Sequence, residues 1–425
     1  MRELGTPTRT TIEAIWRIEA ARLIGGLVRL VRDVAHAEDL AQEALLTALE
    51  KWPESGIPDN PGAWLMTTAK NRAADDWRRS SMMVSKHSEI ESTAPRSTTL
   101  DLDAITEPVG DDVLRLVLTA CHPVLSREAR VALTLRLVAG LSTAEIARAF
   151  LTSETTMAQR IVRSKRTLFE AKVPFEVPAG EELRARIPPT LEVVYLIFNE
   201  GYAATSGDTW VRAELCEEAM RLGRILVGLV PEDAEVHGLL ALMELQASRT
   251  PARVGPHGQP VLLPEQDRSK WDRLLITRGL AGLARAQSLQ HPLGPYTLQA
   301  AIAACHAVAN RPEETDWARI VALYDALVEL TGSPVVELNR AVALSMAFGP
   351  AQALQLVDQL AQDPALRDYH LLPAVRADLL MKLGQRAEAS VEFEKAAGMA
   401  TNPRERELLL TRAASCASGE STPAN

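Results

Sequence analysis

Apolar side chains recur at helical spacing along most of this chain, and no other feature limits its fold as strongly. Between residues 12 and 31 the apolar positions fall three or four residues apart, as one buried face of a helix requires. A second stretch of this kind covers 37–52. A third begins at Asn60, a suitable N-cap, with Pro61 at the first helical position. Good helix formers are abundant. The sequence therefore predicts an all-α protein.

Composition shifts divide the 425 residues into separate helical domains, as expected for a chain too long for one core. We expect a first small domain over 10–80 and a second over 110–172. The polar, acidic stretch 81–109 between them is predicted to be a flexible linker. A boundary rich in proline and glycine covers 173–189. A third, larger helical domain is expected over 180–420.

The third domain has its own internal pattern. Pro188-Pro189 is expected to belong to the break before it, and 250–267, with four prolines, to form a long loop. Near the end, 349–354 resembles 384–389, about 35 residues later. A period near 34 residues is typical of tetratricopeptide repeats, so we predict an α-helical, tetratricopeptide-like repeat domain. The alternative is an unrelated helical bundle.

Charge is distributed unevenly between these parts. Residues 1–175 contain 23 Lys and Arg and 23 Asp and Glu, so the net charge of −9 belongs entirely to residues 176–425. Within the first part the basic residues cluster, as phosphate contact requires. We therefore expect nucleic acid to bind the N-terminal part, and the acidic part to avoid it.

Several classes of protein are disfavoured. No run of about 18 apolar residues predicts a membrane span, and the polar start predicts no signal peptide. The four cysteines form no CxxC pair, so we expect free thiols in a reducing cytoplasm. These residues are Cys121, Cys216, Cys305 and Cys416.

The clearest local motif is a helix-turn-helix over 127–168. Its first helix is expected to end at Gly140, a residue suited to a left-handed C-terminal cap. Ser142 and Glu145, three residues apart, form a capping box for the next helix. Ser153 is expected to cap the last helix.

Polar and basic side chains cover one face of that last helix. Those near its start can reach base edges in a major groove, and the cations further along can hold phosphates. A solvated basic face with no ligand is the alternative. The DNA-binding candidates are Thr155, Thr156, Gln159, Arg160, Arg163, Lys165 and Arg166.

The second motif lies in 33–79. An acidic, amphipathic helix start is followed by a basic helix that carries Trp64 and Trp77. Cations interleaved with aromatic rings can hold and stack unpaired DNA bases. Alternatively both tryptophans belong to the core, which is the interpretation we favour for Trp64.

The two motifs together resemble the sigma-70 family of RNA polymerase sigma factors, in its extracytoplasmic-function group. Asp33 followed by Glu38-Asp39-Leu40-Ala41-Gln42-Glu43 is similar to sigma region 2, and 127–168 resembles sigma region 4. The resemblance implies that region 2 binds core polymerase and the −10 promoter element, and that region 4 reads the −35 element. It assigns polymerase binding to Glu38, Asp39, Gln42 and Glu43. It assigns −10 binding to Lys70, Asn71, Arg72, Trp77, Arg78 and Arg79.

The rest of the chain is similar to a subgroup with a long C-terminal, tetratricopeptide-like extension. Residues 114–123, 150–160, 195–202 and 267–272 carry this likeness. One departure is Leu151-Thr152, in a turn where most sigma factors have glycine. Because a non-glycine residue is disfavoured at positive φ, we expect this turn to be built differently.

A set of polar and aromatic residues in the third domain forms either a functional site or a packing arrangement. The set is Asn199, Glu200, Tyr202, Asp267, Trp271 and Asp272. The histidines show no metal-ligand spacing, and Cys121-His122 is expected to be packing. No phosphate-binding loop or nucleophile motif is present. We therefore predict no catalytic residue, metal or cofactor.

The sequence thus predicts a cytoplasmic sigma factor that binds core RNA polymerase and promoter DNA, with no membrane association. Its C-terminal domain is expected either to regulate the sigma domains by intramolecular contact or to support them structurally. One alternative is a stand-alone helix-turn-helix regulator, which would not need 33–79. A helical scaffold with no DNA role is another, disfavoured by the basic helix over 153–166.

Overall fold

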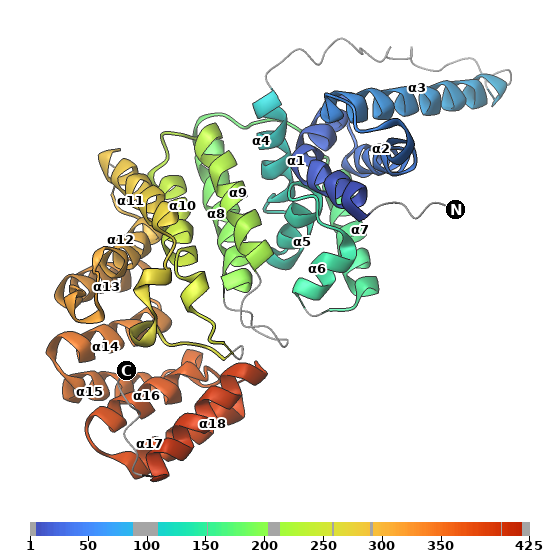
Figure 1. Cartoon of the computed structure of the whole chain (residues 1–425). Helices are drawn as coiled ribbons and strands as arrows, with labels where there is room; N and C mark the ends of the chain where they lie inside the picture. The colour runs from blue at the N-terminus through green and yellow to red at the C-terminus, as the bar shows by residue number, and fades with distance from the viewer. Residues whose placement is uncertain are drawn as a thin grey trace. The chain divides into compact units, whose positions relative to one another are not determined.

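The computed structural model describes residues 6–87, 109–150, 152–202, 213–256, 259–289, 292–400 and 402–418. Within these residues the protein is all-α, which confirms the predicted fold class (Figure 1). The one β-type contact found there is an isolated bridge between Val254 and Pro260. Contacts divide the chain into two compact units, 1–194 and 195–425, and each is described by itself.

The first unit holds two groups of helices and the first half of a helix that continues past Val194. α1 packs on α2 and α3, and α5 packs on α6 and α7. The helices are α1 (Thr6–Val31), α2 (Val34–Ser55), α3 (Pro61–His87), α4 (Val109–Ala120), α5 (Arg127–Leu137), α6 (Thr143–Ala149), α7 (Glu154–Glu170) and α8 (Gly180–Tyr202).

Short polar side chains fix the helix starts where the sequence predicts them. Asn60 Oδ1 accepts a hydrogen bond from the Ala63 amide at 3.0 Å, and Pro61 opens α3. Asp33 caps α2 by accepting from the Ala35 and His36 amides. Each cap satisfies a backbone donor that has no partner within its helix. The predicted cap at Asn60 is confirmed, and α2 continues past Pro53 to Ser55, with Gly56 as its C-cap.

The helix-turn-helix has the predicted caps as well. The Ser142 amide donates to Glu145 Oε2 at 2.7 Å, and the Glu145 amide donates to Ser142 Oγ at 3.2 Å, which is a capping box. Ser153 Oγ accepts from the Thr156 amide at 3.1 Å. Gly140 has a φ of +70°, a conformation that glycine adopts without strain. Leu151 lies outside the described residues.

Pro188 and Pro189 lie inside α8, so the break predicted at that point is wrong. Two prolines remove two backbone donors, which usually ends a helix. Here the flanking apolar residues Ile187 and Leu191 are buried, and the Thr190 hydroxyl donates to the Arg186 carbonyl at 2.9 Å. Burial of the helix face therefore outweighs the local preference of proline.

The second unit is a succession of helices in which most pack on the next along the chain, as Figure 1 shows from α9 to α18. Buried clusters around Leu242, Ile320, Leu338 and Phe393 form its core. Its helices after α8 are α9 (Ala213–Leu229), α10 (Ala234–Ala247), α11 (Arg273–Ser288), α12 (Pro295–Val308), α13 (Trp317–Thr331), α14 (Pro334–Phe348), α15 (Pro350–Leu360), α16 (Leu371–Lys382), α17 (Arg386–Met399) and α18 (Pro403–Ser418).

The spacing of the last helices matches a repeat of about the predicted length. α13, α15 and α17 begin at Trp317, Pro350 and Arg386, so successive starts are 33 and 36 residues apart. That these helices form tetratricopeptide repeats stays a prediction. The loop predicted over 250–267 is irregular and contains the 3-10 helices η1 (Thr250–Ala252) and η2 (Leu263–Glu265).

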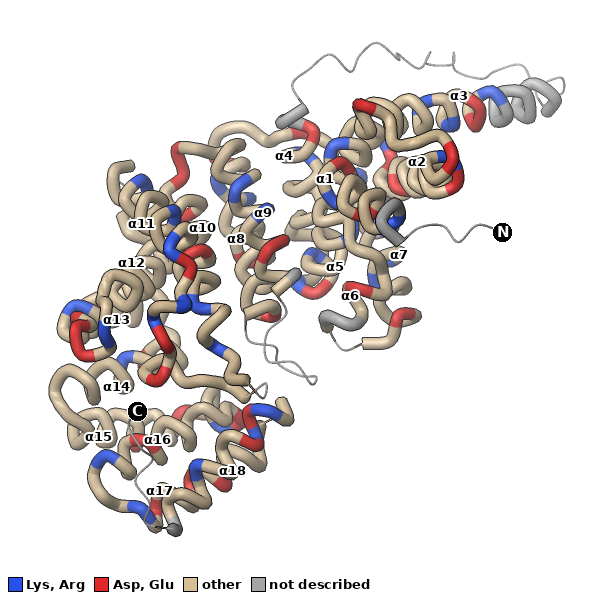
Figure 2. Tube along the Cα trace, viewed as in Figure 1, with Lys and Arg blue, Asp and Glu red and all other residues tan. Residues whose placement is uncertain are grey.

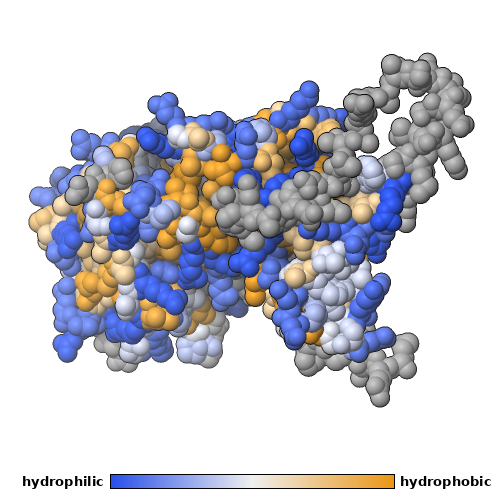
Figure 3. Space-filling view, turned by 90° about the horizontal axis from the view of Figure 1, so that it is seen from above, coloured by the Kyte–Doolittle hydropathy of each residue, from blue (hydrophilic) through white to orange (hydrophobic). Residues whose placement is uncertain are grey.

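Polar side chains cover much of the surface, with apolar patches between them (Figure 3). Among the residues that the structure describes, no helix combines the length and apolar character needed to cross a bilayer.

Candidate nucleic-acid and protein interfaces

Helix α7 presents the predicted DNA-binding face to solvent. Thr155, Thr156 and Gln159 are exposed near its start, and Arg163 and Arg166 follow them. Met157, Ile161 and Leu168 are buried on the opposite face, as the sequence predicts. Burial of one face thus leaves the polar face free for a ligand.

A groove runs between this face of α7 and the start of α5. Thr156, Gln159, Arg160 and Arg163 line it from α7, and Ser126, Glu128 and Ala129 line it from the other side. Hydrogen bonds from its own backbone amide and from Ser126 lower the pKa of Glu128, and Arg160 adds to this effect. The groove places three side chains that could read bases, Thr156, Gln159 and Arg160, beside charges of both signs.

Lys165 differs from the other predicted DNA-binding residues because it is largely buried. Its Nζ donates to Glu38 Oε2 at 2.9 Å. Arg136, from α5, donates from Nε to Glu38 Oε1 at 2.5 Å. Glu38 lies on α2 and is only 4% exposed. The structure thus joins Glu38 to Arg136, 98 positions later, and to Lys165, 127 positions later. The three side chains form one buried cluster of one acid and two cations.

The remaining predicted polymerase-binding residues lie on the same helix as Glu38. Asp39 and Glu43 are exposed, and Gln42 is half-buried. Gln42 lines a cleft of about 440 Å³ between α1 and α2 on one side and the α5–α6 turn on the other. Glu43 pairs with Arg72 of α3 at 3.2 Å, which links two of the predicted surfaces.

Helix α3 carries the predicted −10 residues, and its described part bears basic and acidic side chains together (Figure 2). Asn71, Arg72 and Arg78 are exposed, and the Trp77 side chain is 39% exposed. Lys70 is half-buried. The side chain of Arg79 lies outside the described residues. An exposed ring among cations is what base stacking requires.

Trp64 packs, as expected, against the core rather than projecting from α3. Its ring lies edge-to-face with that of the buried Trp52, with the ring centroids 5.3 Å apart. Such pairs stabilise beyond the area they bury. Of the two tryptophans on α3, Trp77 is therefore the more exposed.

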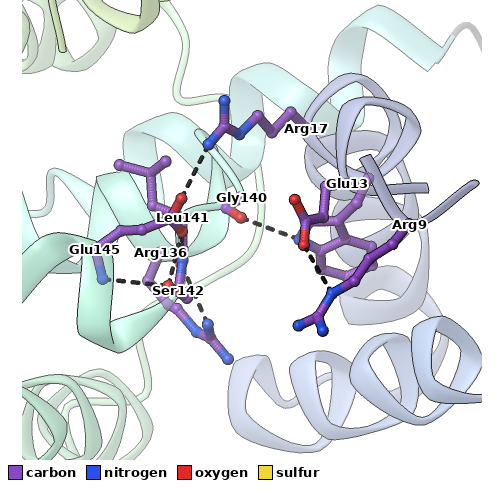
Figure 4. A network of polar contacts seen from close by, with 9 residues as sticks. Arg9, Glu13, Arg17, Arg136, Gly140, Leu141, Ser142 and Glu145 are labelled. Carbon is purple, nitrogen blue, oxygen red and sulfur yellow. Dashed lines mark hydrogen bonds and ion pairs between the residues drawn. The ribbon is translucent and has the colours of Figure 1, made fainter. Parts of the chain in front are cut away.

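A second polar network joins α1 to the turn between α5 and α6 (Figure 4). The buried Trp16 donates from Nε1 to the Gly140 carbonyl at 3.0 Å. Arg17 Nη2 donates to Glu145 Oε1 at 2.9 Å. Burial raises the pKa of Glu145, but hydrogen bonds from Ser142 and Arg17 outweigh it and lower the pKa overall.

Cys121 and His122 take different positions. The Cys121 thiol is buried against the Thr134 hydroxyl at 3.3 Å, and burial raises its pKa to about 11. The His122 Nδ1 accepts from the Val124 amide at 3.1 Å. Among the described residues no group of three His, Cys, Asp or Glu side chains could hold a metal ion.

Three of the residues predicted as a site or packing set, Asn199, Glu200 and Tyr202, lie on α8. Tyr202 stacks on Phe198, and the Arg253 guanidinium lies 3.6 Å from the Tyr202 ring centroid. Asn199 hydrogen bonds to Tyr195. Glu200, on the same helix, is half-buried. This part of the set combines packing with a cation over a ring.

The other three residues are occupied structurally. Asp267 caps a 3-10 helix (η3, Arg268–Lys270) through the Ser269 amide, and Asp272 caps α11 through the Leu274 and Leu275 amides. Trp271 is 3% exposed. The set does not form one site, because capping and burial use these side chains separately.

Two family models match the first unit, and a third matches part of the rest. Sigma-70 region 2 matches residues 17–82, and Sigma-70 region 4 matches 115–168. ECF RNA polymerase sigma factor SigL of Mycobacterium tuberculosis is 31% identical over 158 residues, which cover 37% of this chain and 86% of SigL. The chain belongs to the ECF sigma factors of the sigma-70 family.

Other relatives extend the match beyond the sigma regions. An uncharacterized protein of Rhizobium meliloti is 42% identical over 391 residues, 90% of each chain. The probable ECF RNA polymerase sigma factor SigI of M. tuberculosis is 28% identical over 171 residues, 40% of this sigma factor and 58% of SigI. A family of unknown function, DUF6596, matches residues 186–287. No solved structure matches the chain.

Arg268 is a structurally important residue of this sigma factor that sequence reasoning missed. It is 7% exposed, and its guanidinium donates to the His306 carbonyl at 2.8 Å and the Ala309 carbonyl at 2.6 Å. A third bond reaches the Thr315 hydroxyl at 3.1 Å. In the sequence Arg268 is one arginine within the segment 267–272, and nothing there identifies partners about 40 residues away.

Proposed function

We propose that this sigma factor binds core RNA polymerase and directs it to promoters through two DNA-reading surfaces. The exposed face of α7 would read the −35 element, with Gln159 and Arg160 at base edges and Arg163 and Arg166 on phosphates. The exposed part of α3, with Trp77 among cations, would hold the melted −10 strand. Asp39, Gln42 and Glu43, together with Glu38, would contact the polymerase.

The observation that carries this proposal is the separation of buried and exposed faces on α7. Met157, Ile161 and Leu168 anchor the helix, while the groove side stays polar and open. Such an arrangement leaves the helix N-terminal half free to enter a major groove. Placing two surfaces on DNA requires binding energy and no bond-making chemistry, so we infer that the protein is not an enzyme. The match to the sigma-70 regions supports the further proposal that it acts in the cytoplasm.

Run-off transcription tests this proposal directly. Core polymerase would be assayed on a library of promoter fragments with and without the full chain. We expect protein-dependent start sites that share −35 and −10 elements. Arg160→Ala should change which −35 sequences are used, whereas Arg166→Ala should weaken use of all of them. The absence of both initiation and co-purification with core polymerase would contradict the proposal.

The second unit has two candidate roles, regulation of the sigma regions or structural support for them. Its surplus of acidic residues discourages DNA contact and suits it to a protein partner. A chain truncated after Tyr202 keeps all of α8, including Glu192, which pairs with Arg127 at 3.0 Å. Higher promoter activity of this truncated chain would indicate inhibition by the second unit, and lost activity would indicate support.

A further inference from the structure

Three arginines gather in the second unit, around the irregular segment between α10 and α11. Arg249 and Arg253 flank η1 as its N-cap and C-cap residues, and Arg268 belongs to η3, which packs on η1. The guanidinium carbon of Arg253 lies 3.6 Å from the centroid of the Tyr202 ring, and that of Arg249 lies 5.8 Å from the same centroid. The fold thus brings three cations together, although like charges repel one another.

Arg249 has no counter-ion among the residues that the structure describes. Its side chain makes no hydrogen bond or ion pair with any of them, and its Nε is buried. Two acids close to η3 are engaged in caps, because Asp267 accepts from the Ser269 amide and Asp272 accepts from amides at the start of α11. A partly buried charge without a partner lowers stability, so packing does not account for Arg249.

Arg268 adds positive charge to this place, while its own donors are used. As described above, its guanidinium donates to the carbonyls of His306 and Ala309. Burial lowers the pKa of Arg268, Glu313 and Glu314 oppose this effect, and Arg249 adds to it. The positive charge of Arg249 therefore acts on Arg268, and the donors that can still reach a ligand belong to Arg249.

Neutral side chains complete the surroundings of Arg249. His306 is 8% exposed, and its Nδ1 has no hydrogen-bond partner among the described residues. Burial lowers the pKa of His306 to about 3, with a contribution from Arg249, so the ring is uncharged at neutral pH. Burial raises the pKa of Tyr324 to about 12, which keeps its hydroxyl protonated. These groups can donate hydrogen bonds, but they supply no negative charge.

We propose that Arg249, with Arg253 and Arg268 beside it, binds an oxyanion of a small molecule, a phosphate or a carboxylate group. The planar guanidinium fork matches two oxygens of such a group, and the bound anion supplies the counter-ion that Arg249 lacks. Residues 176–425 carry the whole net charge of −9, which repels anions from most of this part of the chain, so binding has to be local. The site needs neither DNA nor polymerase and goes beyond the proposed function.

Two substitutions of Arg249 distinguish an anion site from a packing role. Arg249→Gln removes the charge, and Arg249→Lys keeps the charge without the planar fork. Because Arg249 lies among cations without a counter-ion, Arg249→Gln should unfold in urea at a midpoint no lower than that of the unchanged chain. A lower midpoint would indicate a structural role and overturn the proposal. Arg319→Gln is the matched control, since Arg319 is exposed on α13 of the same unit.

Hydrogen exchange of the full chain locates the bound anion. Exchange would be compared in inorganic phosphate, in citrate and in sodium chloride of the same ionic strength. We expect phosphate or citrate to slow exchange about tenfold in peptides that cover η1 and the end of α12, because a ligand that binds only the folded form stabilises it there. Arg249→Gln should lose this protection, Arg249→Lys should keep part of it, and Arg319→Gln should keep all of it.

The pattern of protection decides the result. Protection by phosphate alone would assign a phosphate group to the ligand, and protection by citrate alone would assign a carboxylate. Slower exchange only in peptides of α7 would place the anion on the DNA-reading helix and overturn the proposal. Equal protection in every variant, or none near η1, would overturn it as well. Because no step uses polymerase, failure here is distinct from failure of the run-off assay.

Discussion

Arg268→Met should destabilise the second unit more than any exposed substitution nearby. Arg268 belongs to η3, in the loop that precedes α11. Its side chain donates to the carbonyls of His306 and Ala309, at the end of α12, and to the hydroxyl of Thr315. Methionine fills similar apolar space but donates no hydrogen bond. Three buried acceptors would then lose their partner.

The magnitude follows from the cost of those acceptors. A buried acceptor left without a partner costs about 1–3 kcal/mol. Three of them at the lower end cost about 3 kcal/mol, because desolvation of the guanidinium is no longer required and partly offsets the loss. A change of about 3 kcal/mol corresponds to roughly a 150-fold shift in the equilibrium for opening this region. The stability of Arg268→Lys should fall between that of the unchanged chain and that of Arg268→Met, because lysine keeps the charge but not the planar set of five donors.

Hydrogen exchange of the full chain measures this locally, in peptides that cover α12 and the loop before α13. We expect protection there to fall about 100-fold in Arg268→Met, with α16–α18 less affected. Lys270→Met is the control, because Lys270 is exposed in the same 3-10 helix and its contact with Asp267 is 4.0 Å long. Equal protection in Arg268→Met and Lys270→Met would refute the reasoning, since it would mean that these hydrogen bonds contribute nothing.

Three further predictions address binding and pH. Arg160→Ala should reduce discrimination between matched and mismatched −35 sequences by about 1–3 kcal/mol, measured by competition binding of the holoenzyme; unchanged discrimination would exclude a base contact. Trp77→Ala should weaken the open complex by about 1–3 kcal/mol, measured by permanganate reactivity of the −10 strand, with double-stranded binding unaffected. Burial, with Arg249 and Arg268 nearby, lowers the pKa of His306 to about 3. Because the unfolded state alone binds this proton as pH falls below about 6.5, His306 should cost about 1.4 kcal/mol of stability at pH 5.5 relative to pH 8; a His306→Gln variant with the same pH dependence in denaturation would contradict this.

Features set by neighbours in the sequence could be predicted from the sequence. The caps at Asn60, Ser142 and Ser153 each bond to an amide three residues on, so the motif contains both partners. The buried side of α7 follows from spacing alone. The family also follows from residue patterns within single helices, because region 2 and region 4 each keep their motifs close together.

Features set by distant partners could not be predicted. Glu38 is one acid among several on an amphipathic helix, and nothing local indicates that it meets Arg136 and Lys165. Arg268 was overlooked for the same reason. The sequence predicts a break at Pro188, where the structure has a continuous helix. Tertiary burial of α8 overrides the strong local preference of proline. The linker predicted over 81–109 falls largely on 88–108, which lie outside the described residues.

The burial of the Glu38 cluster has a consequence for ionic strength. Mobile ions screen exposed charges within a Debye length of about 10 Å at 0.1 M salt but act far less on a desolvated pair. Contacts between cations and DNA phosphates, in contrast, weaken steeply as salt rises, because binding no longer gains as much from counterion release. Raising salt should therefore weaken contacts of the exposed Arg163 and Arg166 with DNA phosphates while sparing the buried bond between Lys165 and Glu38.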